Sequence, residues 1–369
     1  MNLQIAIIIS IFGLWISMSL FVRYFAYTDW PVWIKAIWFL VCGAVAFLPV
    51  LGAREWSAFY GSYFPLVETA LYFIYIFAII LFSFTFMRDV CWLVLSWFRL
   101  LKSPFEVVGF ARANWITMAV AFVCSVWALY AGMKVPDMKH VFISDPKIVQ
   151  EKTIVVLSDL HISRTLNPDK VKGIVERANA VQPDVILLAG DIVDDEVKEI
   201  DDTLQLLGNL KGKQGVYFVS GNHEFYVGYQ ASMQALAKTG LISLEDKKIE
   251  LEPEFYLAGV SDMRTTARLG DVSNAARILR DVPQEAYTLL VSHSPTPLDL
   301  PFDLQVSGHT HGGQIFPFHV FTWLGNHHLL SGYYPKERIY VSRGSGQWGP
   351  PMRLLAPAEI TVIHLKPPK

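Results

Sequence analysis

The chain has 369 residues, of which 53% are hydrophobic and 17% are charged, and its formal net charge is −2. This length allows more than one domain, and so apolar a composition is unusual for a soluble enzyme of this size. Eight Lys or Arg and five Asp or Glu lie before residue 135, so the remainder has 23 basic and 28 acidic residues and a charge of −5. An acidic C-terminal part makes nucleic acid an unlikely partner, because non-specific binding needs a basic surface.

Four apolar stretches in the first third of the chain predict transmembrane helices. Each approaches the length of about 20 apolar residues that an α-helix needs to cross a bilayer. The spans are expected near residues 3–22, 32–52, 67–87 and 114–133. Residues 91–101 contain Trp92, Trp97 and Arg99 and are followed by Lys102, which predicts a short helix lying in the membrane interface. Residues 1–134 are therefore predicted to be a four-helix, multi-pass region of the cell membrane, with the lipid bilayer as its partner.

The basic residues between these spans predict the orientation of the chain. Four spans place both termini on the same side of the membrane. The loops on the opposite side carry six Lys or Arg, whereas those on the side of the termini carry four. Because basic loops favour the cytoplasm, the C-terminal half is expected to lie outside it.

The pattern changes at residues 135–152, where charges and two prolines appear. A linker is expected there, followed by one catalytic domain over residues 153–369. Helical patterns occur at residues 168–181, 196–210, 228–238 and 271–280, and additional strands are expected at 255–260, 338–342 and 359–365. This alternation predicts an α/β domain.

Five short apolar runs in this half end directly at residues with metal-binding side chains. The runs are residues 154–158, 185–190, 216–221, 288–292 and 304–308. The residues that follow them are Asp159 and His161, then Asp191, then Asn222 and His223, then His293, and last His309 and His311. Such runs are typical of buried strands, and side chains at the carboxyl ends of strands converge on one crevice. The sequence therefore predicts a metal site at that crevice.

The residue types indicate which chemistry this site supports. Carboxylate, imidazole and amide ligands together suit Mn, Fe, Zn or Co better than Ca or Mg. Two such cations about 3.5–4 Å apart serve phosphoester hydrolysis, because they stabilise both the entering and the leaving oxygen. Cations so close together need an anionic bridge, which a carboxylate supplies best. Two divalent cations are therefore expected as cofactors.

The order of the motifs resembles that of the calcineurin-like metallophosphoesterase superfamily. The motifs are Asp159-x-His161, Gly190-Asp191-x-x-Asp194, Gly221-Asn222-His223-Glu224, His293 and Gly308-His309-x-His311. Each motif alone arises often by chance, whereas all five in this order are specific. The resemblance covers residues 153–365 and implies an αββα fold, a β-sandwich flanked by helices. It also implies a metal-dependent phosphoric ester hydrolase.

Carried over position by position, the resemblance implies a role for each site residue. The ligands of the first cation would be Asp159, His161 and His311, those of the second would be Asn222, His293 and His309, and the bridge would be Asp191. His223 would be catalytic rather than a ligand. It would face the scissile phosphate and either stabilise its charge or protonate the leaving oxygen.

Two acidic residues of the motifs, which are not among the seven expected ligands, have two interpretations each. Asp194 either orients a ligand histidine or caps the following helix. Glu224 either supports a ligand from behind or belongs to the start of a helix.

Arginine residues are candidates for substrate contact, because the guanidinium fork suits phosphate oxygens. Arg343 and Arg353 lie in or near a glycine-rich segment, and Arg164 and Arg264 are rivals. The alternative for each of them is a surface ion pair.

Two further features narrow the resemblance. The run from Gly308 to Ile315, with the sequence GHTHGGQI, resembles small membrane-associated bacterial phosphoesterases. In the protein-phosphatase branch, Arg-Gly follows the Gly-Asp-x-x-Asp motif, but here Asp195 and Glu196 follow Asp194. A phosphoprotein substrate is therefore disfavoured.

The segment 316–334 is more apolar than an exposed loop normally is. It is either a partly buried loop packed over the sheet, or a lip beside the site that dips into the membrane or grips a lipid.

The leading hypothesis is a membrane-anchored, dinuclear phosphoesterase that cleaves a phosphodiester or pyrophosphate bond in a lipid or cell-envelope metabolite. A nucleotide phosphodiesterase is the second enzymatic reading. The intact ligand set disfavours a catalytically silent metal-binding protein. The expected spans contain no paired charges, which disfavours a transporter.

Overall fold

The computed structural model describes residues 3–26, 28–102, 110–262, 264–265 and 275–368. The chain divides into two units. One comprises Met1–Tyr130 with Gly349–Leu354, and the other comprises Ala131–Trp348 with Leu355–Lys369.

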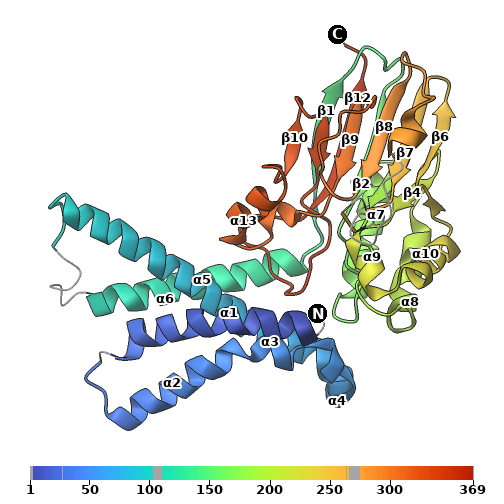
Figure 1. Ribbon diagram of the computed structural model, residues 1–369. Helices are drawn as coiled ribbons and strands as arrows, with labels where there is room; N and C mark the ends of the chain where they lie inside the picture. Colours follow the sequence, from blue (N-terminus) through green and yellow to red (C-terminus); the bar gives the residue numbers. More distant parts are fainter. Residues whose placement is uncertain (1–2, 27, 103–109, 263, 266–274, 369) are drawn as a thin grey trace. The chain divides into compact units, whose positions relative to one another are not determined.

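The first unit is helical (Figure 1). Its principal helices are α1 (Leu3–Phe21), α2 (Val32–Ala46), α3 (Leu48–Leu51), α4 (Ser57–Tyr60), α5 (Phe64–Trp97) and α6 (Phe110–Met133), of which α6 runs on into the second unit. A π-helical turn, Val22–Ala26, extends α1. The side chains of Phe21 and Phe25 pack on Phe39 and Trp38 of α2, so α1 and α2 form a helical hairpin.

Among the described residues, three helical stretches are long and apolar enough to cross a membrane. They are Ala6–Ala26, Ser57–Trp97 and Arg112–Met133. The expected span 32–52 corresponds to α2, of 15 residues, and α3, with a break at Phe47 before Pro49. The count of four spans therefore remains a prediction.

The prediction of a separate interfacial helix at residues 91–101 is wrong, because these residues do not form a helix of their own. Helix α5 continues without a break through Trp97 over 34 residues. The reason is in the sequence, because residues 66–97 contain neither Gly nor Pro to end the helix.

The second unit contains two six-stranded sheets. The first has the order β1-β12-β2-β3-β4-β5. Its strands are β1 (Asp137–Ser144), β2 (Lys152–Leu157), β3 (Val185–Ala189), β4 (Val216–Val219), β5 (Ile242–Ser243) and β12 (Glu359–Lys366). Strands β2 to β5 run parallel to one another, and β12 is antiparallel to β2.

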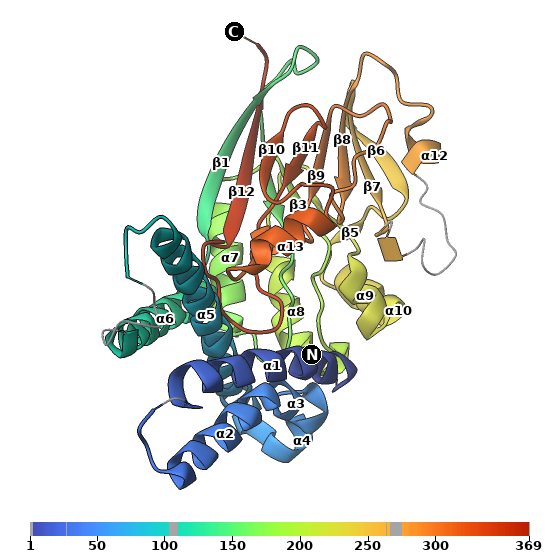
Figure 2. The same cartoon turned by 60° about the vertical axis from the view of Figure 1, so that its left-hand side comes forward.

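The second sheet has the order β10-β11-β9-β8-β7-β6. Its strands are β6 (Lys247–Glu252), β7 (Phe255–Val260), β8 (Tyr287–Ser292), β9 (Leu304–Ser307), β10 (Gly332–Tyr334) and β11 (Ile339–Val341). Strands β7, β8, β9 and β11 are parallel, and β6 and β10 are antiparallel edge strands. Figure 2 shows the two sheets from a second direction.

Three apolar layers hold this unit together. Residues of β2, β3 and β12 pack against those of β7, β8 and β9 between the sheets. Helices α7 (Pro168–Ala180), α8 (Val197–Gln205) and α10 (Tyr229–Lys238) cover the outer face of the first sheet. Helix α12 (Ala275–Leu279) packs on β7 and β8. The predicted α/β fold, a sandwich flanked by helices, is confirmed.

The expected helices and strands agree with these elements except at their ends. The pattern at 196–210 ends as an α-helix at Gln205 and continues as a 3₁₀ turn over Leu206–Asn209. Residues 271–274 of another expected helix lie outside the described part of the chain.

The prediction of a linker at residues 135–152 is wrong for Asp137–Ser144, which form strand β1. Strand β1 lies inside this range and pairs with β12 in parallel from Asp137↔Glu359 to Ser144↔Lys366. Most of its side chains are exposed, because β1 is an edge strand, and so it lacks the apolar run that marks the buried strands.

Candidate metal centre

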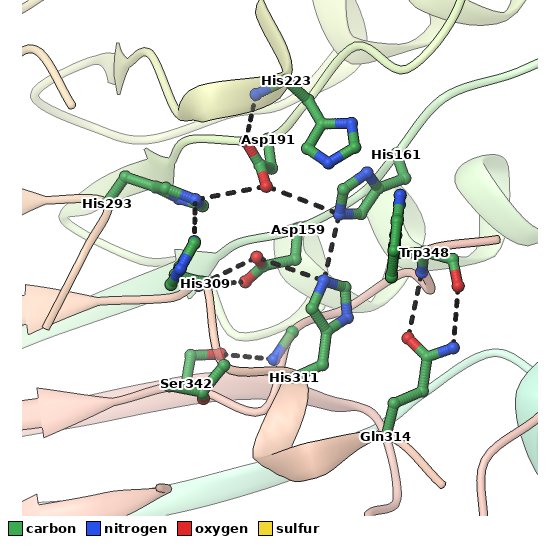
Figure 3. Close-up of polar contacts among 12 residues, drawn as sticks. Asp159, His161, Asp191, His223, His293, His309, His311, Gln314, Ser342 and Trp348 are labelled. Carbon is green, nitrogen blue, oxygen red and sulfur yellow. Dashed lines mark hydrogen bonds and ion pairs between the residues drawn. The ribbon is translucent and has the colours of Figure 1, made fainter. Parts of the chain in front are cut away.

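The candidate ligands follow the carboxyl ends of strands in both sheets. Asp159 and His161 follow β2, Asp191 follows β3, and Asn222 begins helix α9 (Asn222–Val227) after β4. His293 follows β8, and His309 and His311 follow β9. The sandwich brings the seven together; Figure 3 shows six of them, and Asn222 contacts His293. His309 is half-buried and the other six are buried.

Asp159, His161 and His311 form one cluster. The Nε2 atoms of His161 and His311 lie 3.0 Å apart. Nε2 of His311 is 3.5 Å from Oδ1 of Asp159. Nitrogen and carboxylate oxygen atoms that converge in this way can share one cation.

Asn222, His293 and His309 form the second cluster. Nε2 of His293 lies 3.2 Å from Oδ1 of Asn222 and 3.2 Å from Nδ1 of His309. Nδ1 of His293 is 2.9 Å from the carbonyl oxygen of Ala189. If Nδ1 carries the proton and donates to this carbonyl, Nε2 is left as an acceptor toward a cation.

Asp191 lies between the two clusters. Its Oδ1 accepts a hydrogen bond of 2.8 Å from the backbone N–H of His223. Its Oδ2 is 3.2 Å from Nε2 of His293 and 3.7 Å from Nε2 of His161. One carboxylate oxygen therefore faces a histidine of each cluster, which is the arrangement that a bridging ligand requires.

Five of the seven candidate ligands have a strained backbone. Positive φ angles occur at Asp159 (53°), His161 (48°), Asp191 (51°), His309 (70°) and His311 (50°). Non-glycine residues in this region cost roughly 1–3 kcal/mol each, and they gather at functional sites, where the surrounding structure enforces them.

Glycine is required at two positions by the lack of space. A Cβ atom at Gly221 would collide with Oδ1 of Asp191, and one at Gly308 would collide with Oδ2 of Asp159. Neither collision is relieved without moving a candidate ligand.

Comparison with known proteins agrees with this geometry. Residues 152–313 match the family model of calcineurin-like phosphoesterases. An uncharacterised metallophosphoesterase of Campylobacter jejuni is 33% identical over 255 residues, which cover 66% of this chain and 68% of that one. The chain belongs to the calcineurin-like metallophosphoesterase family. Its membership indicates a phosphoester hydrolase.

Two further relatives extend the comparison. A metallophosphoesterase of Helicobacter pylori is 35% identical over 245 residues, which cover 64% of this chain and 66% of that one. A transmembrane protein with a metallophosphoesterase domain from Danio rerio is 29% identical over 278 residues, which cover 70% and 64%. The aligned part spans about two thirds of the length of these relatives. The apolar helices of this chain and its similarity to the transmembrane protein from Danio rerio together indicate that the metallophosphoesterase is associated with a membrane.

Asp194 contacts two histidines of the site. Its Oδ1 is 2.6 Å from Nδ1 of His223, and its Oδ2 is 3.3 Å from Nδ1 of His161. Burial lowers the pKa of His223, but Asp194 and Asp191 outweigh this effect and raise it to about 9. Of the two interpretations of Asp194, the geometry favours the orientation of histidines, since helix α8 starts only at Val197.

Glu224 is buried and combines both of its expected roles. Its carboxylate accepts the N–H of Gly221 at 2.6 Å, which closes the first turn of α9. It also accepts the N–H groups of Asp191 (3.1 Å), Ile192 (2.7 Å) and Val193 (2.8 Å). Glu224 thus holds the loop after β3 against the start of α9.

The four arginines considered for substrate contact differ in the groups that they contact. Arg343 pairs with Glu359 at 2.8 Å, and Arg164 pairs with Asp195 at 2.9 Å. Arg353 is buried and belongs to the helical unit, where its N–H donates to the carbonyl of Ala128. Arg264, expected only as a rival, lies beside a candidate ligand, with Nη1 3.3 Å from Nε2 of His309.

Sequence reasoning missed a buried carboxylate behind the second cluster. Asp262 follows β7 and accepts hydrogen bonds from Ser294 at 2.6 Å and from the N–H of Thr265 at 2.9 Å. Burial raises its pKa, but His293 and these hydrogen bonds leave it below the ordinary value. Its signal was available, because Asp262 stands two residues after the end of an expected strand, close to a strand end as the ligands are.

Proposed function

We propose that this protein is a membrane-anchored phosphoesterase that uses two divalent cations to hydrolyse a phosphodiester or pyrophosphate bond. The position of Asp191 carries the proposal, since one of its oxygens faces a histidine of each cluster. The family supports the reaction class, and the apolar helices support the anchoring.

The residues present fit two cations. Burial raises the pKa of Asp159, His293 opposes this effect, and the neighbouring Asp191 adds to it. Two buried carboxylates so close together need positive charge between them. Arg264 faces Nε2 of His309, which leaves Nδ1 of that ring toward His293 and a cation. The mixture of imidazole and oxygen atoms suits Mn, Fe, Zn or Co.

Asp159, His161 and His311 would hold one cation, Asn222, His293 and His309 the other, and Asp191 both. When bound, such a pair supplies Lewis acidity that lowers the pKa of water and offsets the charge of the phosphate. Asp194 fixes the ring of His223 through Nδ1, which leaves Nε2 for the substrate. The imidazolium form of His223 can then donate a proton to the leaving oxygen.

An amphiphilic substrate is the best match to the surface beside the site. Helix α13 (Phe318–Gly325) exposes Val320, Phe321 and Leu324, each by more than half. Arg264 links this helix to the site, because its Nη2 donates to the carbonyl of Gly325 at 3.3 Å. We therefore propose a lipid or another cell-envelope metabolite as the substrate.

Two substitutions test the assignment. Asp191→Ala is expected to remove both cations and nearly all hydrolysis of bis-p-nitrophenyl phosphate with added Mn²⁺. His223→Ala should keep the cations and lose about 10²–10⁴ in rate, the range of a general acid or base. His140→Ala, at an exposed position on β1, serves as the control and should retain full activity. Loss of metal from His223→Ala would show that this histidine is a ligand instead.

A further inference from the structure

Two aromatic side chains flank His223. Tyr226 lies one turn further along α9, with its ring centroid 5.3 Å from that of His223. The centroid of Trp348 is 6.0 Å from the same imidazole. Figure 3 shows the indole of Trp348 beside His161 and His223. Both aromatic rings stand steeply to the imidazole, at 62° and 70°, so neither stacks on it.

Both rings are solvent-exposed, unlike the aromatic residues between the two sheets. Tyr226 is 55% exposed and Trp348 is 37% exposed, whereas Tyr217, Tyr287 and Tyr340 are buried. Burial in the core therefore does not account for Tyr226 and Trp348. Large aromatic side chains at the mouth of a site present flat apolar area at a low cost in side-chain entropy.

The position of Trp348 is fixed by its backbone. The side chain of Gln314 forms two hydrogen bonds with it: Nε2 donates to the carbonyl at 2.8 Å, and Oε1 accepts the N–H at 3.0 Å (Figure 3). The buried Lys170 donates to the side chain of the preceding Gln347, and to the carbonyl of Gly132 at 2.6 Å. A residue whose backbone is held in this way has less freedom to lose when a ligand binds to its side chain.

We propose that Tyr226 and Trp348 form a binding platform for a flat ring on the leaving-group side of the substrate. The inference rests on the proposed function, in which His223 protonates the leaving oxygen. Whatever is attached to that oxygen must extend past the imidazole, where these two rings lie. The shared ligand chemistry is a flat apolar face, which a nucleobase or one side of a sugar provides. Stacking of a base on one aromatic side chain changes affinity by about 5- to 100-fold.

The test compares three product-like inhibitors of bis-p-nitrophenyl phosphate hydrolysis by the metal-loaded, full-length enzyme: AMP, ribose 5-phosphate and inorganic phosphate. In the unaltered enzyme AMP should bind more tightly than phosphate. Trp348→Ala and Tyr226→Ala should each raise the inhibition constant of AMP about 10-fold and leave that of phosphate unchanged. Trp348→Phe should retain most of the affinity, because it keeps a flat ring. Phe142→Ala, an exposed aromatic position on β1, is the matched control.

The outcomes show whether the group that binds to the platform is a nucleobase or a sugar. A rise for AMP alone identifies a base, and an equal rise for AMP and ribose 5-phosphate identifies a sugar. An equal rise for all three inhibitors, or no rise for any, overturns the platform. Calorimetric titration of the same compounds keeps the test independent of turnover. Selective binding of AMP without hydrolysis would refute the proposed function and leave the platform standing.

Discussion

Glu245 lies behind the loop that leads to Asn222. Its carboxylate accepts the N–H of Ser220 and is 3.2 Å from the hydroxyl of Tyr229. Burial outweighs the hydrogen bonds from Ser220 and raises the pKa of Glu245 from 4.5 to about 7. The folded chain therefore holds this proton over a pH range in which the unfolded chain has lost it.

This raised pKa predicts a pH-dependent stability. Between about pH 4.5 and 7 the folded state binds more protons than the unfolded state, so its stability falls as the pH rises. Glu245→Gln should therefore be more stable than the unaltered protein at pH 8, by about 1–3 kcal/mol, and should lose this advantage at pH 4.5. Thermal unfolding at both values measures the difference. Glu176→Gln, exposed on α7, should show no such crossover. Parallel curves for Glu245→Gln and the unaltered protein would contradict the assignment.

Sequence reasoning predicted which residues meet at the centre, because each of them stands at a strand end and has a metal-binding side chain. It could not rank the arginines. Arg264 and His309 are 45 residues apart, and no local pattern links them. It also missed Trp348, whose backbone is bound by a glutamine 34 residues earlier.

At the scale of elements, the segment 316–334 departs from the loop that was expected. It contains α13 and β10. Leu329 is buried against β11, as in a packed loop, while α13 exposes apolar side chains, and contact of α13 with the membrane or a lipid stays a prediction. Residues 304–336 contain no Asp or Glu. An apolar helix in a stretch without acidic residues suits contact with lipid.

Helix α13 is expected to affect lipid substrates only. Phe321→Ser combined with Trp323→Ser removes two exposed aromatic side chains, so hydrolysis of a phospholipid substrate in vesicles should fall about 10-fold or more. Hydrolysis of bis-p-nitrophenyl phosphate should be unchanged. Equal losses on both substrates would remove the lipid-contact role of α13.

Strand β1 and helix α5 are two elements that the hydrophobic pattern of the sequence did not predict correctly. The exposed edge strand carries charged residues and so looked like a linker. The composition of the long helix changes from apolar to mixed along its length, and this change predicts two helices where the structure has one.

At the scale of the whole molecule, the division into an apolar helical part and an α/β part was predictable from composition. The number of spans was not, because α2 is shorter than a bilayer and is followed by a break at Phe47. If α1 and the α2–α3 pair cross the membrane as a hairpin, four crossings result, and both termini lie on one side.

The orientation can be tested directly. Alkaline phosphatase fused after Lys369 is expected to be active, because that enzyme folds only outside the cytoplasm, and the basic residues between the expected spans predict that the catalytic half lies there. A fusion placed in the loop between α5 and α6 should be inactive and serves as the control. The reverse pattern would place the catalytic half in the cytoplasm.

The metal content of the full-length protein tests the central claim most directly. After reconstitution with Mn²⁺ and removal of the unbound metal, elemental analysis should give two divalent cations per chain. One cation or none would contradict a dinuclear centre bridged by Asp191.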